Sequence, residues 1–181
     1  MKTLILILLI TIFSYAISIP NRVYTSVVSV NGDRITLSEP LSKGMSALVV
    51  RSTSSGEYAL VFIEYAFKNS AVIIDKDPVG TENLAKLKPI PKVGDRVIGG
   101  FNYDKALVLA PKNSYNQIVS QLSVKVIDPD IYNSYLASKG SSSYRDFAKL
   151  VGIGIVIVSK GNTIEIIDAI SGKVLSREEI K

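Results

Sequence analysis

The residue types that carry most enzyme chemistry are missing from this chain, which has no histidine and no cysteine. It therefore lacks the commonest general base, the thiol nucleophile and the commonest soft metal ligands. A serine enzyme with a lysine base requires Ser-x-x-Lys, and an α/β-hydrolase requires Gly-x-Ser-x-Gly, but neither pattern occurs. We therefore expect a protein that is not an enzyme and that uses no cofactor and no metal ion.

Paired carboxylates are the remaining catalytic candidates. Asp75 and Asp77 form one pair, and Asp128 and Asp130 form another; two such acids could act as acid and base or bind calcium. The second pair falls at a predicted helix start, where capping and the helix dipole favour negative charge. Asp77 precedes a proline, which is typical of a turn. We predict structural roles for all four; a carboxylate hydrolase is the alternative, and it predicts a deep cleft with two convergent acids.

The glycines of Gly152-Ile153-Gly154 lie between a predicted helix and a predicted strand. A phosphate-binding loop needs the opposite order, from a strand into a helix. The segment is therefore predicted to be a close-packing turn.

Lysine side chains are the candidates for contact with a protein partner. The net charge of +5 is spread along the chain, with a local cluster only at Lys86, Lys88 and Lys92, so we expect no nucleic-acid binding. That cluster suits either an acidic partner or lipid headgroups, or is a solvated loop. Lys181 follows Arg177, Glu178, Glu179 and Ile180, a segment that reads as an exposed polar tail. It is the candidate protein-binding residue.

The amino terminus predicts export. Lys2 supplies a positive start, residues 4–13 an apolar run, and Ser14-Tyr15-Ala16 the small residues that a signal peptidase reads. We expect residues 1–16 to be a cleaved signal peptide, with a permanent membrane anchor as the alternative, because the run is shorter than the roughly 20 residues of a spanning helix. Without cysteine there is no disulfide and no lipid attachment point. These features predict a bacterial protein of the periplasm or cell surface.

The elements that must position these residues form two units. Residues 17–102 show short alternating strands separated by turns such as Asn31-Gly32, which predicts a small barrel-like unit of five or six strands. The expected strands are 24–30, 34–37, 45–51, 57–65, 71–75 and 96–101. Residues 77–91 interrupt them and are expected to be a surface excursion.

Residues 103–181 predict an α/β unit with a mixed sheet and about three helices, so the fold class is α+β. Tyr115, Ile118, Val119 and Leu122 form a helical stripe, and a second helix starts after Asp128. Its inner face is expected to be Ile131, Tyr132, Tyr135 and Leu136, and a third helix carries Phe147, Leu150 and Val151. Residues 153–158 are wholly apolar and are expected to form a central strand. The tyrosines are thus expected in core packing rather than in a carbohydrate-binding face.

Several segments together resemble the amino-terminal domain of bacterial plasminogen-binding proteins. They are Ser29-Val30-Asn31-Gly32, residues 92–111, Asp128-Pro129-Asp130-Ile131-Tyr132, residues 147–158 and residues 168–175. Tyr103-Asp104-Lys105-Ala106 is the most specific of the shared motifs. The resemblance implies a surface or envelope protein whose partner is plasminogen. A carboxyl-terminal lysine at position 181 would present the ammonium and carboxylate that the kringle pockets of plasminogen accept, although the lysine-rich tail associated with binding in that family is absent from this sequence.

The second half is also similar to α/β modules of periplasmic assembly proteins. The similarity lies in a helix, a strand, a hairpin and an Asp-x-x-Ser-Gly-Lys-Val turn. It implies the alternative function of a scaffold or adaptor that binds a component of an envelope complex, such as a flagellar motor or an outer-membrane assembly.

Overall fold

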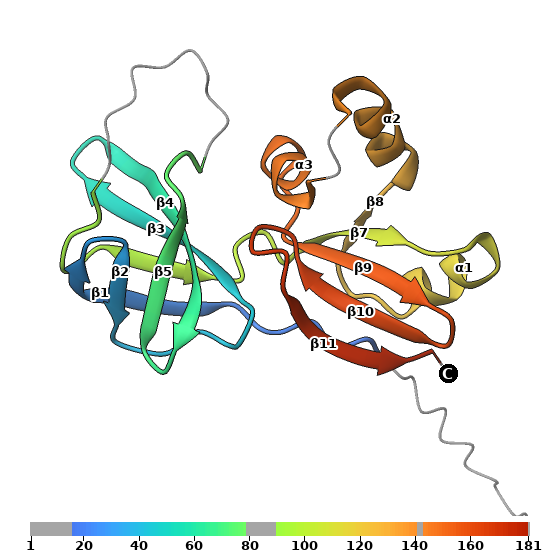
Figure 1. Ribbon diagram of the computed structural model, residues 1–181, viewed down its shortest axis with the longest axis horizontal. Helices are drawn as coiled ribbons and strands as arrows, with labels where there is room; N and C mark the ends of the chain where they lie inside the picture. Colours follow the sequence, from blue (N-terminus) through green and yellow to red (C-terminus); the bar gives the residue numbers. More distant parts are fainter. Residues whose placement is uncertain (1–15, 79–89, 141–142, 181) are drawn as a thin grey trace, which may run out of the picture.

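Six antiparallel strands close into a barrel in the first half of the chain (Figure 1). The computed structural model describes residues 16–78, 90–140 and 143–180. Around the barrel the strand order is β1-β2-β5-β4-β3-β6, and β6 pairs with β1 to complete the ring. The strands are β1 (Val23–Asn31), β2 (Arg34–Leu37), β3 (Ser46–Thr53), β4 (Gly56–Phe67), β5 (Ser70–Asp75) and β6 (Arg96–Gly99).

The alternation of apolar and polar residues explains why these segments close on themselves. Ile35 and Leu37 in β2, Val49 in β3 and Val97 in β6 are buried and point into one shared core. Because side chains alternate across a strand, the residues between them face outward. Closure pairs every strand on both sides, so the barrel leaves no unpaired edge.

A five-stranded mixed sheet forms the second half, in the order β11-β10-β9-β7-β8. The central pairs are parallel, β7 with β8 and β7 with β9, and the hairpins β9–β10 and β10–β11 are antiparallel. The strands are β7 (Lys105–Leu109), β8 (Lys125–Ile127), β9 (Ile155–Lys160), β10 (Thr163–Asp168) and β11 (Val174–Glu179). Parallel neighbours need crossover connections, and the helices supply them.

Three helices cover the two faces of this sheet. α1 (Lys112–Ser120) connects β7 to β8, and its Ile118 is buried with Ile155, Ile157 and Ile164 of one face. α2 (Pro129–Lys139) and α3 (Tyr144–Val151) lead from β8 to β9 and pack on the other face (Figure 1). In the described residues no helix is long and apolar enough to cross a membrane.

The helix ends follow their sequence signals. The Asp128 carboxylate accepts a hydrogen bond from the Asp130 amide (2.9 Å) at the start of α2, and Ser143 accepts one from the Asp146 amide at the start of α3 (3.4 Å). Gly140 and Gly152 end the two helices in the left-handed conformation. These caps satisfy amides and carbonyls that a helix end leaves unpaired.

The α+β class, the barrel, the mixed sheet and the three helices confirm the sequence-based fold prediction. The apolar strand β9 is central, as expected. One core prediction was wrong: Ile131, expected on the inner face of α2, is half exposed. The predicted signal peptide lies almost wholly outside the described residues, as does most of the predicted excursion.

Candidate protein-binding surfaces

The carboxylate pairs found in the sequence have structural partners. Asp75 accepts a hydrogen bond from the Asp77 amide (2.8 Å) and forms an ion pair with Lys149 of α3 (2.9 Å). Asp128 caps α2, and Asp130 lies in the first turn of that helix. Within the described ranges no group of three acidic side chains gathers to hold a metal ion. Asp75, Asp128 and Asp130 thus each have a place in the local structure.

Asp168 is the polar centre of the junction between the barrel and the sheet. It lies at the end of β10, is fully buried and accepts five hydrogen bonds. One carboxylate oxygen accepts from the Ser46 amide and hydroxyl (both 2.8 Å) and from the Tyr103 hydroxyl (2.7 Å). The other accepts from the amides of Ile170 (3.0 Å) and Ser171 (2.7 Å). Burying a carboxylate is tolerable only when it is satisfied in this way.

Tyr103 shows how strongly this junction is organised. Burial, then the charge of Asp168 and the hydrogen bond to it, raise the pKa of the Tyr103 hydroxyl far above its ordinary value. The hydroxyl therefore remains a proton donor at any physiological pH. The junction rigidly holds one side of the barrel, through Ser46 of β3, against the end of the sheet.

A second buried carboxylate, Asp95, organises the barrel end. Arg51 donates to both Asp95 oxygens (2.9 and 2.8 Å), and the Lys92 amide donates to one of them (2.7 Å). Burial by itself raises the pKa of Asp95, but the Arg51 and Lys92 hydrogen bonds outweigh it and the net pKa lies below the ordinary value. The fork of Arg51 is thus used within the fold and is not offered to a ligand.

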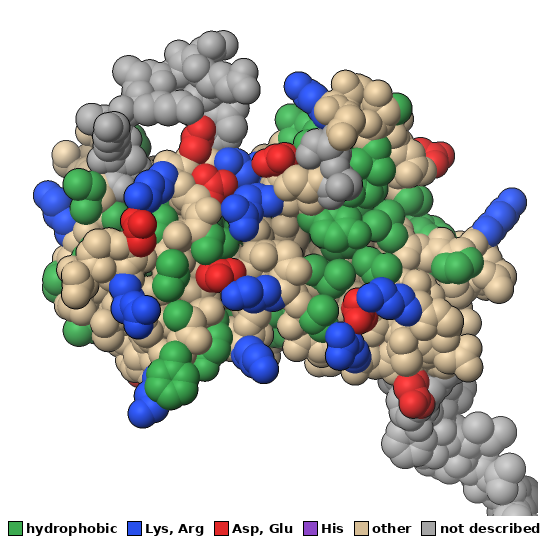
Figure 2. Space-filling view, in the orientation of Figure 1, with side chains coloured by type: hydrophobic (Ala, Val, Ile, Leu, Met, Phe, Trp, Pro, Cys, Tyr) green, Lys and Arg blue, Asp and Glu red, His purple; other side chains and the backbone are tan. Residues whose placement is uncertain are grey.

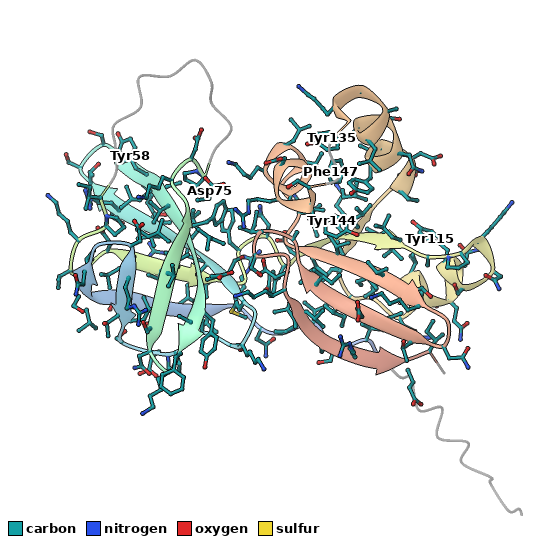
Figure 3. All side chains as sticks on the ribbon, viewed as in Figure 1. Tyr58, Asp75, Tyr115, Tyr135, Tyr144 and Phe147 are labelled. Atoms are coloured by element: carbon teal, nitrogen blue, oxygen red, sulfur yellow. The ribbon has the colours of Figure 1, made fainter. Side chains whose placement is uncertain are left out.

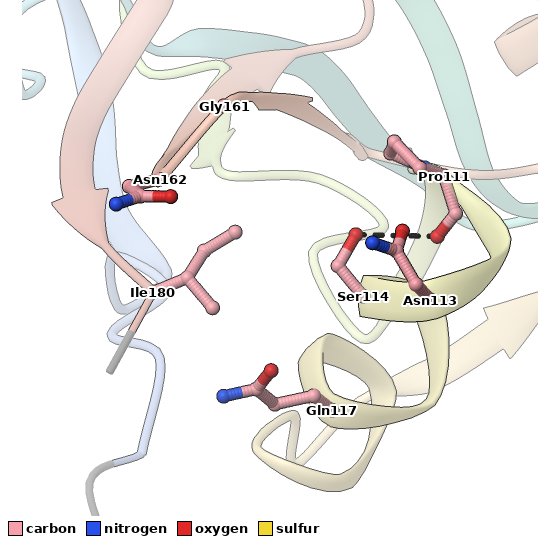
Figure 4. A pocket seen from close by; sticks show the side chains of 7 residues that line it. All are labelled: Pro111, Asn113, Ser114, Gln117, Gly161, Asn162 and Ile180. Atoms are coloured by element: carbon pink, nitrogen blue, oxygen red, sulfur yellow. Dashed lines mark hydrogen bonds between the residues drawn. The ribbon is translucent and has the colours of Figure 1, made fainter.

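An open groove of about 490 Å³ lies beside the end of β11 (Figure 4). Its lining is mostly polar and combines the start of α1, the β9–β10 turn and Ile180: Pro111, Asn113, Ser114, Gln117, Gly161, Asn162 and Ile180. The Ile180 amide donates to the Asn162 carbonyl (2.7 Å), which fixes the last described residue at the groove. The end of β11 lies at the side of the sheet remote from the barrel (Figure 1).

An apolar surface with a charged border lies on the sheet face that carries α2 and α3. Four residues of this face are successive Cα partners across the sheet, namely Leu109, Val158, Glu165 and Arg177. Lys160 joins this row because its ammonium pairs with the Glu165 carboxylate (2.6 Å). We call these five residues the open sheet face. In Figure 2 hydrophobic side chains gather here, between the two helices and the charged border.

Aromatic rings border the same surface. The Tyr132 ring meets Phe147 edge-on (centroids 4.9 Å apart), and the Tyr135 ring lies 5.3 Å from Phe147. Tyr144 lies 5.8 Å from Tyr132. Figure 3 shows Tyr135, Tyr144 and Phe147 between α2 and α3, above the sheet. The expectation that tyrosines of these helices pack in the core is met at Tyr132, whereas Tyr135 and Tyr144 are only partly buried.

Of the lysines proposed from the sequence as contact residues, the structure describes only Lys92. Lys181, the candidate protein-binding residue, lies outside the described residues, and so do Lys86 and Lys88. Lys92 is exposed, with its amide on Asp95. Sequence reasoning missed the role of Asp168, although the Asp-x-x-Ser-Gly turn that it starts was visible. It also missed the open sheet face, because the sequence of a single strand does not show which residues of the neighbouring strand it pairs with.

These features define a class: an α+β protein in which a closed barrel is joined to a mixed sheet through a buried polar junction. Residues 22–181 match the family model described as "Plasminogen-binding protein pgbA N-terminal", and the chain belongs to that family. The match covers both the barrel and the sheet. No curated protein and no solved structure matches the chain.

Proposed function

We propose that this chain is an exported, non-enzymatic protein that binds plasminogen. The observation that carries the proposal is the family match over residues 22–181. The chemistry of the chain supports it, since the sequence has no histidine or cysteine and its buried acids are engaged in structural hydrogen bonds. Contact with a protein needs neither a cofactor nor a reactive side chain.

We further propose Lys181 as the residue that enters a lysine-binding kringle pocket. Such a pocket must pair the ammonium itself, so a lysine that is largely buried in an ion pair is not available to it. Lys149 is held in this way, since its side chain is only 14% exposed beside Asp75. Position 181 follows Ile180 at the outer end of β11, where a chain ending in lysine would offer both an ammonium and a carboxylate.

The experiment is capture of plasminogen by the chain without residues 1–16, immobilised for surface plasmon resonance. We expect 6-aminohexanoic acid to abolish capture, and deletion of Lys181 to weaken it at least tenfold. Lys139→Ala is the matched control, because Lys139 is an exposed lysine at the end of α2 and should leave capture unchanged. Capture that survives both the analogue and the deletion would refute the terminal-lysine mechanism, and no capture at all would refute plasminogen binding.

Export and placement need a separate measurement. Fractionation of the native cells should find the chain without its first 16 residues in the periplasm or at the surface. Recovery of the protein in the cytoplasm with residues 1–16 attached would refute export. Crosslinking to a stable envelope complex, without plasminogen capture, would instead support the scaffold or adaptor function.

A further inference from the structure

The open sheet face is the part of its side of the sheet that α2 and α3 do not fully cover. The neighbouring row across the same face is Leu107, Val156 and Ile167, which α2 and α3 bury. The next row, with Leu109 and Val158, is only partly buried. Apolar strand residues that their own fold leaves partly uncovered can bury further surface only against another molecule.

The charges on this face are not balanced. Glu165 is 10% exposed and accepts hydrogen bonds from Lys160 and from the Nε of Arg177 (2.9 Å), whereas the Lys160 and Arg177 side chains are 60% and 69% exposed. These two hydrogen bonds hold the pKa of Glu165 below its ordinary value, so the carboxylate stays charged. One buried anion thus fixes two exposed cations in place and leaves a net positive charge.

The guanidinium of Arg177 still has donors to offer. It has five N–H groups in a planar fork, and among the described residues only Nε–H is used, on Glu165. A carboxylate from outside can therefore be bound by the remaining edge of the fork, with Lys160 beside it. The arginine is already oriented by Glu165, which lowers the entropic cost of such binding.

We propose that the open sheet face binds an extended segment of a partner protein in which a carboxylate side chain lies next to apolar side chains. The apolar side chains would cover Leu109 and Val158, next to the Tyr135 and Tyr144 rings, and the carboxylate would reach Arg177. A second copy of this chain is a poor occupant, because a two-fold contact through this face would bring its net positive charge against itself. The function of this surface does not depend on plasminogen binding.

The test uses the chain without residues 1–16 and two labelled twelve-residue peptides. One peptide alternates leucine with aspartate, and its matched partner alternates leucine with lysine. Fluorescence anisotropy should show at least tenfold tighter binding of the aspartate peptide, and nuclear magnetic resonance shifts should map to Leu109, Val158 and their neighbours. Equal binding of the two peptides, or shifts confined to the barrel, would overturn the proposal.

Variants distinguish binding at this surface from a general effect of positive charge on peptide binding. The double variant Lys160→Gln and Arg177→Gln should weaken binding of the aspartate peptide at least tenfold. Arg96→Gln is the control, because Arg96 is an exposed arginine of the barrel that likewise pairs with a glutamate, Glu57, and it should leave binding unchanged. Equal losses in the double variant and the control would contradict a specific site. Binding to vesicles of anionic lipid that persists in the double variant, without peptide binding, would assign the chain a membrane partner instead.

Discussion

The barrel and the sheet both bury apolar side chains, but the barrel does so by closing on itself and the sheet by packing against helices. The barrel is entirely antiparallel and closed, so each of its strands has two neighbours. The sheet has a parallel centre and two edge strands, β11 and β8, and its helices leave part of one face uncovered. This difference indicates where binding surfaces can arise. Closure buries the core of the barrel and pairs its backbone, whereas an open sheet covered by short helices leaves apolar side chains near solvent.

The contrast also extends to charge. In the barrel, Arg51 forms an ion pair with the buried Asp95, so its guanidinium is engaged within the fold. In the sheet, Glu165 holds Lys160 and Arg177 outward. Substitutions at the junction and within each part test how far the barrel and the sheet behave as separate bodies.

Asp168→Asn should cost the most and should affect both parts together. An amide has one accepting oxygen, so two or three of the five donors would lose their partner, which costs about 4 kcal/mol. Urea unfolding should shift to a much lower midpoint, with one transition for probes in the barrel and in the sheet. Tyr103→Phe, which removes a single donor, should cost less. A barrel that keeps its stability while the sheet melts would show that the junction does not couple them.

Gly154→Ala should disrupt the place where the sheet meets the linker from the barrel. A Cβ there would lie 2.5 Å from the Phe101 carbonyl oxygen and 2.7 Å from that of Asn102, and backbone cannot move aside cheaply. We expect a loss of about 3 kcal/mol in thermal or urea unfolding. Gly152→Ala is the comparison: its Cβ would meet only side-chain ends, Asn102 Nδ2 and Lys105 Nζ, at an ordinary 3.7 Å, but its φ is positive, so its cost should be about 1 kcal/mol. Equal costs would argue against close packing.

Asp95→Asn should weaken the barrel and change its acid sensitivity. Because the folded pKa of Asp95 is lowered, the Arg51 pair stabilises the fold above the unfolded pKa, about 4, and this contribution is lost as the pH falls through the folded pKa. We expect a loss of about 2 kcal/mol at neutral pH, shrinking toward zero in acid. Urea midpoints measured from pH 7 to pH 2 check this; parallel curves for the two proteins would contradict it.

Lys149→Met should have an effect confined to α3. Lys149 and Asp75 are each 14% exposed, but Arg145 also ties α3 to the carbonyls of Ile170 (2.7 Å) and Ile74 (3.2 Å), and Asp75 keeps the Asp77 amide. Loss of the ion pair should therefore cost about 2 kcal/mol, less than the roughly 3–5 kcal/mol of a fully buried pair. Hydrogen exchange should speed up in α3 and remain unchanged in β9. Uniformly faster exchange would mean that this pair supports the whole sheet.

Local signals made most of the fold predictable from sequence. Asn31-Gly32, Asp128 with Pro129, and the apolar run of β9 each act over a few residues, and the structure follows them. Ile131 was misplaced because helical periodicity does not say how much of a helix the sheet can cover. The open sheet face needed the register of four strands, and three of the five donors to Asp168 come from two distant residues, Ser46 and Tyr103. Neither arrangement can be read from spacing along the chain.

The first described residues carry one more consequence. The Ile17 amide donates to the Gln121 carbonyl (3.1 Å), its side chain is buried in the core that α1 shares with the sheet, and the Ser18 amide donates to Glu178 of β11 (3.2 Å). A ribosome releases Ile17 and Ser18 well before β11. These two residues therefore stay without their partners until β11 has been made, and a tag fused directly before Ile17 would hinder their docking.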